Sequence, residues 1–319
     1  MASEALRSGA GVKPAPRLGS FWGQARIPLL FLLPAGVLVI TFFVWPVVNT
    51  ILLSLTNLST ANFGNPDFVG LENYASLWGN RWMPRVFSNS IFYLVATLAL
   101  FNLGMALVIA ISTTFVPERA GNGIRLFWLL PRITSPVVFV LIFQGILAPA
   151  PFGVLSQLTG VSQNWINAHP WTVIVLANGI IGASFGMLIF TAAIRSIPTE
   201  QFQAAAVDGA SQMFLVRKVI LPQLRWPILF VTAYQSLALL SSFEYILLLT
   251  NGGPGFYTTE VWSLWAYKEA FQSYAGTARF GLGSAMAACL VVIAFVISLI
   301  ILRSFRFKDL VAKPKIEVN

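Results

Sequence analysis

Hydrophobic residues in this 319-residue chain form six long runs, separated by shorter polar segments. Each run is close to the ~20 residues that an α-helix needs to cross the hydrocarbon core of a bilayer. The pattern therefore predicts an all-α, polytopic membrane protein with six transmembrane helices. The runs are about 27–50, 86–111, 126–148, 171–194, 226–249 and 282–302, and Pro34, Pro46 and Pro136 are expected to kink the helices that contain them.

A polar segment flanks the predicted transmembrane region at each end. Residues 1–26 contain four basic residues among Gly, Ser and Pro, which is typical of a flexible tail. A signal peptide is the competing interpretation, but the apolar run that follows is too long and lacks a clear small-residue cleavage site. We expect a six-helix transmembrane domain over 27–305 and a short C-terminal tail over 306–319.

Composition supports the membrane interpretation and excludes several kinds of chemistry. The chain is 57% hydrophobic and 10% charged, whereas a soluble domain has roughly 25% charged residues. Cys289 and His169 are the single cysteine and histidine, so disulfides, zinc sites and thiol catalysis are not expected. An intramembrane enzyme would need paired acids, a Ser–His arrangement or a metal cluster within the spans. The sequence also lacks a phosphate-binding loop, so this chain should not hydrolyse ATP.

The distribution of basic residues predicts the orientation of the helices. The net charge of +9 alone would allow a nucleic-acid partner. However, fifteen of the 20 Lys and Arg residues fall on the side that holds both termini, and four fall on the other side. Because basic residues concentrate in cytoplasmic loops, we expect both termini in the cytoplasm, and no nucleic-acid partner.

A polar segment on the predicted cytoplasmic side, residues 196–225, separates the fourth and fifth hydrophobic runs. Pro198, Thr199 and Glu200 suit the first turn of a helix. Asp208-Gly209 should end that helix in a turn, since glycine adopts backbone angles that other residues resist. A second short helix before Pro222 would complete a helix–turn–helix protrusion that could dock into a groove of another protein.

This segment resembles the EAA loop of binding-protein-dependent ABC importer permeases. The alanine pair, the Asp-Gly-Ala turn and Ile220-Leu221-Pro222 match the family spacing, and Gln203 stands where the family usually has Glu. The resemblance implies that the segment, called here the coupling loop (residues 196–225), inserts into the cleft of an ATPase subunit. A chance Asp-Gly turn in an ordinary loop is the alternative. The residues expected to couple to the ATPase are Gln203, Ala204, Ala205, Asp208, Gly209, Ala210, Arg217 and Pro222.

Two other motifs carry a resemblance. Gly70-Leu71-Glu72-Asn73-Tyr74 resembles an element of carbohydrate-type permeases, with an unspecific amphipathic segment as the alternative. The segment 249–254, Leu-Thr-Asn-Gly-Gly-Pro, resembles the maltose and glycerol-phosphate branch of these permeases, together with Tyr267, Ala270, Phe271 and Gly276. The resemblance implies a permease subunit in the bacterial plasma membrane that imports a sugar or related polyol. It also implies a second, homologous permease, two ATPase subunits that bind ATP and Mg²⁺, and an extracytoplasmic solute-binding protein. No cofactor is expected in this chain.

Polar residues on the two runs that flank the coupling loop are candidates for the solute site. Side chains four and seven positions apart share one helical face, and polar groups inside a membrane face a cavity or another helix. A sugar site needs hydrogen-bonding amides and hydroxyls, with an aromatic ring to stack on a pyranose. The alternative is that these residues join helices together. The candidates are Asn178, Gly182 and Phe185 on the fourth run, and Gln235, Leu239 and Ser242 on the fifth.

Glu244 is the remaining candidate, because it is an acid well inside the fifth run. In a continuous helix it would lie on a different face from Ser242, and an ionised carboxylate there needs a partner or water. A proton-coupled carrier that works without ATPases is one alternative function. A permease for glycerol phosphate is another, although few cations lie near the proposed site. The sequence does not identify the solute.

Overall fold

The computed structural model describes residues 30–272 and 277–304. The predicted tails, 1–26 and 306–319, lie outside the described residues. The chain divides into two compact units, 1–50 and 51–319. Within the described part of the first unit, a helix begins at Leu30 and includes a π-helical segment η1 (Ile40–Val44). It continues as α2 (Trp45–Ser54).

The second unit is helical, and among its described residues the β pairing consists of one isolated bridge between Thr56 and Phe68. Its elements are α3 (Glu72–Trp78), α4 (Met83–Thr97), η2 (Leu98–Met105), α5 (Ala106–Ser112), α6 (Glu118–Ile133), α7 (Pro136–Leu147), α8 (Val154–Thr159), α9 (Trp165–Ala168), α10 (Pro170–Arg195), α11 (Thr199–Val207), α12 (Gln212–Leu215), η3 (Val216–Ile220), α13 (Leu221–Gln223), α14 (Arg225–Ser241), α15 (Glu244–Leu249), α16 (Trp262–Phe271) and α17 (Phe280–Ser304).

Several of these helices are long and apolar enough to cross a membrane. Within the described residues, Leu30–Ser54, Met83–Ser112, Pro170–Arg195 and Phe280–Ile300 meet this criterion. The bent pair α6–α7 makes a fifth span if it is counted as one. The predicted fifth run contains α14, which has 17 residues, and the separate helix α15. The all-α membrane fold is therefore confirmed, while the count of six spans stays a prediction.

The third predicted span is bent sharply where the sequence suggested a kink. Helices α6 and α7 meet at 101°. Thr134 and Ser135 between them have ψ values of 138° and 139°, and Pro136 is the first residue of α7. A residue before proline avoids the α-helical region, so Ser135 interrupts the helix and Pro136 starts a new one.

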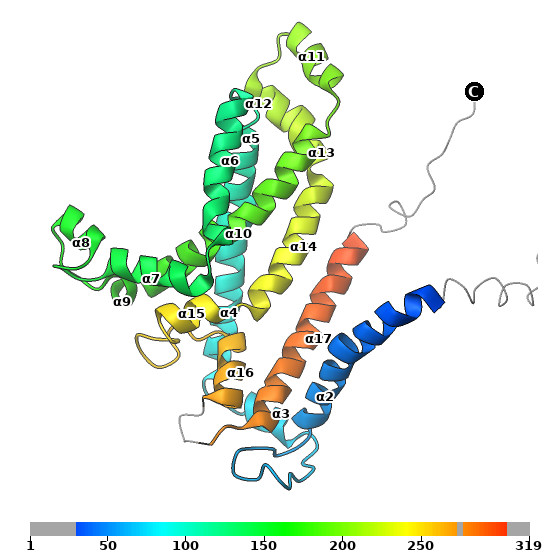
Figure 1. The fold of residues 1–319 in the computed structure, drawn as a ribbon, viewed down its shortest axis with the longest axis vertical. Helices are drawn as coiled ribbons and strands as arrows, with labels where there is room; N and C mark the ends of the chain where they lie inside the picture. The colour runs from blue at the N-terminus through cyan, green and yellow to red at the C-terminus, as the bar shows by residue number, and fades with distance from the viewer. Residues whose placement is uncertain (1–29, 273–276, 305–319) are drawn as a thin grey trace, which may run out of the picture. The chain divides into compact units, whose positions relative to one another are not determined.

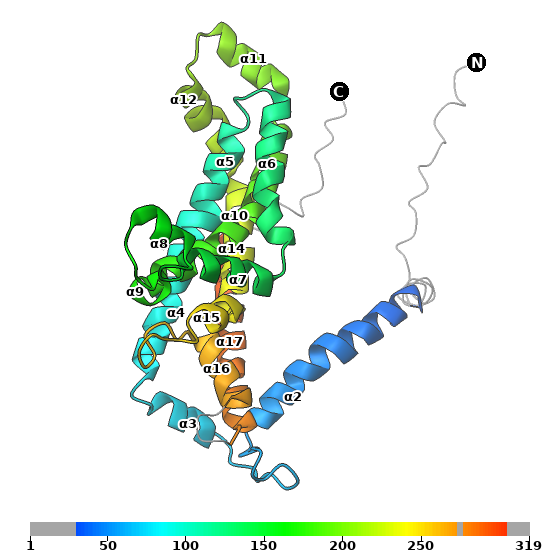
Figure 2. The same ribbon diagram turned by 60° about the vertical axis from the view of Figure 1, so that its left-hand side comes forward.

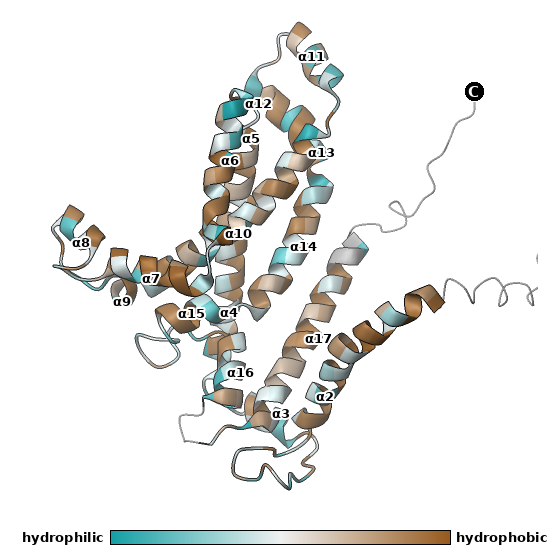
Figure 3. Cartoon of the chain, in the orientation of Figure 1, coloured by the Kyte–Doolittle hydropathy of each residue, from teal (hydrophilic) through white to brown (hydrophobic). Residues whose placement is uncertain are grey.

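Helix α10 is the centre of the second unit. Buried residues occur on all of its faces, including Ile174, Ala177, Ala183 and Phe190. It packs against η2, α5, α6 and α14, and Figures 1 and 2 show it among these neighbours. A helix that is apolar all round is expected to be enclosed by other helices. Figure 3 shows hydrophobic residues along α7, α10 and α14, and hydrophilic residues on α11 and near α13.

Within the second unit, the coupling loop and α3 lie at opposite ends of the helical bundle (Figures 1 and 2). The Gly-Leu-x-Asn-Tyr motif fixes α3 in place. The Asn73 side chain donates hydrogen bonds to the carbonyl oxygens of Ser54 and Thr56, both at 2.8 Å. The Tyr74 hydroxyl lies 2.7 Å from Ser54 Oγ. This motif therefore ties α3 to the residues that precede it.

Candidate functional site

The coupling loop consists of short helices joined by a tight turn. Helix α11 ends at Val207, and Gly209 has a φ of +71°. A Cβ added to Gly209 would have no neighbouring atom within 4 Å. The left-handed backbone angle, and not close packing, therefore requires glycine here. Ser211 begins the next helix by accepting a hydrogen bond from the Phe214 amide at 3.3 Å.

The coupling loop has an exposed outer surface and a buried base. None of the residues of α11 is buried, and Val207 is 88% exposed. At the base, Phe202 and Val216 pack against a core cluster that contains Ile220 and Leu224. The coupling loop therefore presents an exposed outer surface on a base that is anchored in the core.

Six of the predicted coupling residues lie on α11 or at this turn, whereas Arg217 lies on η3 and Pro222 on α13. The Ala205 carbonyl accepts a hydrogen bond from the Ala210 amide at 2.9 Å, which closes the turn. Ala205 and Ala210 are half-buried, and the exposed members of the set are Gln203, Ala204, Asp208, Gly209, Arg217 and Pro222.

A second polar region lies between helices of the bundle, where η2, α10, α14 and α15 line a partly open cavity of about 290 Å³, called here the membrane cavity. Six of the seven predicted solute-site residues line this cavity. They are Asn178, Gly182, Gln235, Leu239, Ser242 and Glu244, and the cavity is also lined by Asn102, Ala238 and Ser241.

Hydrogen bonds hold the polar side chains of the cavity in place. Asn178 Nδ2 donates to Ser242 Oγ at 3.0 Å and to the Tyr93 hydroxyl. Gln235 Nε2 donates to the Gly182 carbonyl at 2.8 Å. These bonds join α10 to α14 and to the residue that follows it. The same side chains therefore connect helices and line the cavity, so the two interpretations of these residues are compatible.

Asn102 on η2 has an unusual environment. It is 1% exposed, and its Oδ1 has no hydrogen-bond partner. A Cβ added to Gly182 would lie 2.1 Å from this oxygen. Glycine at position 182 therefore makes room for the Asn102 amide. A buried acceptor without a partner is costly, and a ligand hydroxyl could satisfy it.

A helix break brings Ser242 and Glu244 to the same cavity. The expectation that they lie on different faces assumed a continuous helix. In the structure α14 ends at Ser241, Ser242 is extended with a ψ of 119°, and Glu244 begins α15. Because the chain changes direction here, helical periodicity does not apply across the two residues, and both line the cavity.

Phe185 is the predicted solute-site residue that the structure places elsewhere. Its ring stacks on Tyr234 with centroids 4.6 Å apart, and the Arg132 guanidinium lies 5.5 Å from its centroid. Phe185 does not line the cavity that contains Asn178 and Gln235. This aromatic side chain therefore supports the helical packing beside the cavity.

The family of this chain is decided by its sequence. Residues 75–311 match the family of binding-protein-dependent transport system inner membrane components. The chain belongs to this family. It is therefore a permease, the non-catalytic membrane subunit of an ABC transporter.

Relatives align with this permease over nearly their whole length. A probable ABC transporter permease of Pyrococcus horikoshii is 30% identical, with 85% of this chain and 92% of the relative aligned. The trehalose/maltose transport system permease MalF of Thermococcus litoralis is 27% identical over 89% of this chain and 95% of its own. The sulfoquinovosyl glycerol transport system permease SmoG of Agrobacterium fabrum is 27% identical over 90% of this chain and 92% of its own.

The fold of the permease is also that of a solved transporter. A chain of a bacterial ABC transporter involved in the import of alginate superposes with a TM-score of 0.76 at 22% identity. The match covers 93% of this chain and 100% of the other. A chain of a bacterial alginate ABC transporter, solved in complex with a periplasmic protein that binds an alginate pentasaccharide, superposes with a TM-score of 0.77, also at 22% identity. At this identity the likeness establishes the fold alone.

Sequence reasoning missed two polar residues at the membrane cavity of the permease. Asn102 lines the cavity, and Tyr93 on α4 accepts a hydrogen bond from Asn178, which lines it. Both lie within the second hydrophobic run, where a polar side chain is a signal of function or packing. That signal was available, but only the tertiary structure shows that this run faces Asn178 and Gln235.

Proposed function

We propose that this permease carries a neutral sugar or related polyol across the bacterial plasma membrane as part of an ATP-driven importer. The observation that carries the proposal is the cavity lined by two asparagines, a glutamine and two serines. Amide and hydroxyl groups recognise a polyhydroxylated solute by donating and accepting hydrogen bonds. At about 290 Å³ the cavity is near the lower end of the ~300–1,000 Å³ usual for ligand pockets. A second permease subunit would enlarge it.

The charge of the cavity favours a neutral solute. Glu244 is its single charged lining residue, and Lys, Arg and His are absent from the lining within the described part of the chain. A carboxylate repels phosphate, sulfonate and uronate groups. This supports a neutral sugar over glycerol phosphate, which is the second candidate.

We also propose that the coupling loop lies in the cytoplasm and contacts an ATPase subunit that binds ATP and Mg²⁺. The distribution of basic residues supports this orientation. The exposed surface around Gly209 and Val207 supports docking. The base of the loop packs on the core cluster with Ile220 and Leu224, and this contact would pass a movement of the ATPases to the bundle.

The complete importer would contain this permease, a second homologous permease, two ATPases and an extracytoplasmic solute-binding protein. Closure of the ATPases on ATP would move the coupling loops as rigid bodies and switch the cavity from inward-facing to outward-facing. The binding protein would then release sugar into it. In this scheme the chain itself performs no chemical step.

Affinity purification of the tagged permease in mild detergent tests the proposal. We expect a second permease and an ATPase to co-purify, and a neutral sugar to bind the associated solute-binding protein in a ligand screen. Purification of the permease without an ATPase, combined with uptake that an ionophore abolishes, would instead support a proton-coupled carrier.

A further inference from the structure

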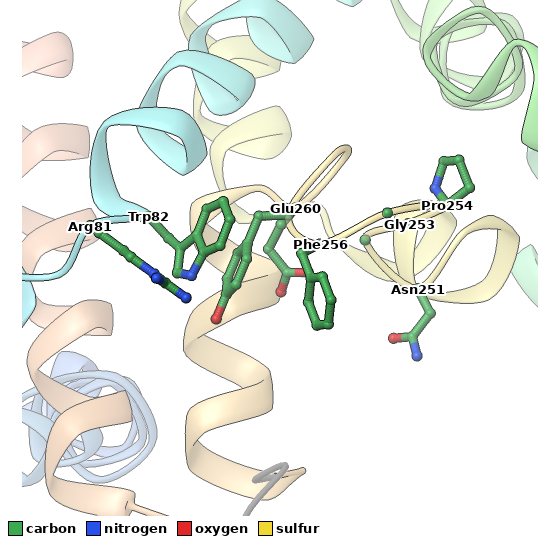
Figure 4. A pocket seen from close by; sticks show the side chains of 10 residues that line it. Arg81, Trp82, Asn251, Gly253, Pro254, Phe256 and Glu260 are labelled. Carbon is green, nitrogen blue, oxygen red and sulfur yellow. The ribbon is translucent and has the colours of Figure 1, made fainter.

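A second cavity, called here the outer pocket, lies apart from the membrane cavity. It has a volume of about 510 Å³ and shares no lining residue with the first. Its walls are the segment 251–257, Glu260 and the two residues before α4, Arg81 and Trp82 (Figure 4). The helices beside it, α16 and the start of α4, lie toward the end of the bundle opposite α11 (Figures 1 and 2). In the proposed orientation this is the extracytoplasmic end.

The Leu-Thr-Asn-Gly-Gly-Pro motif is held by a buried ion pair. Lys268 Nζ lies 2.7 Å from Glu260 Oε2, and both side chains are 4% exposed. The same ammonium donates to the Asn251 carbonyl at 2.8 Å. Gly252 has a φ of +80°, and a Cβ there would lie 1.9 Å from Glu260 Oε2. The motif therefore folds its backbone directly over the ion pair.

Further hydrogen bonds fix this backbone to its neighbours. Thr259 Oγ1 donates to the Gly253 carbonyl at 2.7 Å. Asn89 on α4 donates to the carbonyls of Tyr257 and Glu260, both at 3.0 Å. The outer pocket is therefore a preorganised feature, and a preorganised site loses little entropy when a ligand binds.

One oxygen of the ion pair is left without a partner. Glu260 is 3% exposed, and its Oε1 makes no hydrogen bond. Burial raises the pKa of the Glu260 carboxyl, and the hydrogen bond from Lys268 opposes that shift. Buried carboxylate oxygens are normally hydrogen-bonded. Glu260 lines the outer pocket, so a donor on a bound ligand would satisfy this oxygen once the carboxylate turns toward the opening.

Aromatic rings form the rest of the wall. Trp82 stacks on Tyr257 with centroids 4.9 Å apart, and the Arg81 guanidinium lies 5.0 Å from the Trp82 centroid. Phe256 is 85% exposed at the pocket. Aromatic side chains bury the apolar faces of a ligand, and those of Trp and Tyr also carry a polar end.

These groups select a ligand by charge. Lys268 neutralises Glu260 within the ion pair, so Arg81 is the lining charge that disfavours a cation. An anion without a hydroxyl group offers no donor to Glu260 Oε1. A purely apolar group would leave the carboxylate oxygen unsatisfied. A neutral polyhydroxylated ring donates to Glu260, accepts from Arg81 and places its C–H face against an aromatic ring.

We infer that the outer pocket is a carbohydrate subsite that holds a neutral sugar ring at the extracytoplasmic mouth, before the sugar enters the membrane cavity. This inference rests on the proposed function. It assigns a role to Glu260, Trp82 and Phe256 that is separate from that of Asn178 and Gln235.

Saturation-transfer NMR on the full-length permease in nanodiscs tests the inference, with glucose, maltose and trehalose as probes at millimolar concentration. We expect transfer to the ring protons of at least one probe. Phe256→Ala should weaken it about fivefold, as expected for the loss of one aromatic contact. Trp82→Leu should act in the same direction. Phe152→Ala is the matched control, because Phe152 is 83% exposed and does not line the pocket.

Three results would overturn the subsite. They are no transfer from any probe, equal signals in Phe256→Ala and Phe152→Ala, and weaker association with the solute-binding protein in Phe256→Ala with sugar transfer unchanged. Asn178→Ala separates this inference from the proposed function. If Asn178→Ala removes the sugar signal and Phe256→Ala leaves it intact, the subsite is wrong while the membrane cavity still binds sugar.

Discussion

The coupling loop takes all of its residues from one continuous segment, whereas the membrane cavity takes its lining from η2, α10, α14 and the residues before and at the start of α15. In the loop, the decisive feature is local, since Gly209 is required by its own backbone angle. In the cavity, the decisive features are contacts between helices, such as Asn178 with Ser242. Changes in the loop should therefore act on coupling whatever the solute, and changes in the cavity should act on solute affinity.

The largest expected effect is at the turn of the coupling loop. Gly209→Val places a β-branched residue at a φ of +71°, which such residues strongly resist. We expect this change to abolish ATP-driven uptake and co-purification with the ATPase, measured in reconstituted vesicles and by affinity purification. Gly160→Val is the matched control, since Gly160 has a φ of +70° and equally open surroundings outside the loop. Equal uptake by the two variants would contradict the role of the loop.

The next effect is expected inside the membrane cavity. Gly182→Ala places a Cβ against Asn102 Oδ1, and overpacking of this kind costs about 1–3 kcal/mol. Because Gly182 also lines the cavity, a loss of about 1.4 kcal/mol in sugar binding would lower uptake at low sugar concentration about tenfold. Gly145→Ala is the control, because a Cβ there meets no atom within 4 Å. The double variant Gly182→Ala/Asn102→Ser should recover part of the lost uptake, because the serine side chain is shorter. No recovery would indicate that the clash with the new Cβ lies elsewhere.

A smaller effect is expected from the hydrogen-bonding groups of the cavity. Asn178→Ala should raise the KM for sugar uptake about fivefold and leave the maximal rate nearly unchanged, since a hydrogen bond contributes about 0.5–1.5 kcal/mol. Ser184→Ala is the comparison, because Ser184 is also buried on α10 but bonds the Trp128 carbonyl and does not line the cavity. If Ser184→Ala raises KM equally, the effect of Asn178 is general helix packing.

The coupling loop and the membrane cavity also differ in how far the sequence could predict them. The turn at Gly209 follows from an Asp-Gly pair after a good helix former, so local rules were sufficient. Helical periodicity placed Asn178 and Gly182 on one face, because α10 is continuous from Pro170 to Arg195. The same rule failed between Ser242 and Glu244, because the helix breaks there within an apolar run. It also gave no account of Asn102, whose place beside Gly182 depends on the packing of η2 against α10.

The smallest effect is expected at Gln203, where the family usually has an acid. Gln203 is exposed on α11, and exposed ion pairs contribute about 0–1 kcal/mol. Gln203→Glu should therefore change the ATPase activity of the assembled transporter by less than about fivefold. Gln201→Glu, on the same exposed helix, is the control. A complete loss of coupling in Gln203→Glu alone would show that this interface requires a neutral side chain.

The central claim is that a separate ATPase drives solute through this permease. The most direct measurement is sugar uptake by vesicles that contain the purified permease pair, with or without the ATPases, the binding protein and internal ATP. We predict that uptake requires the ATPases, the binding protein and internal ATP. We also predict that an ionophore that collapses the proton gradient leaves uptake unchanged. Uptake by the permease alone, or uptake that the ionophore abolishes, would contradict the account.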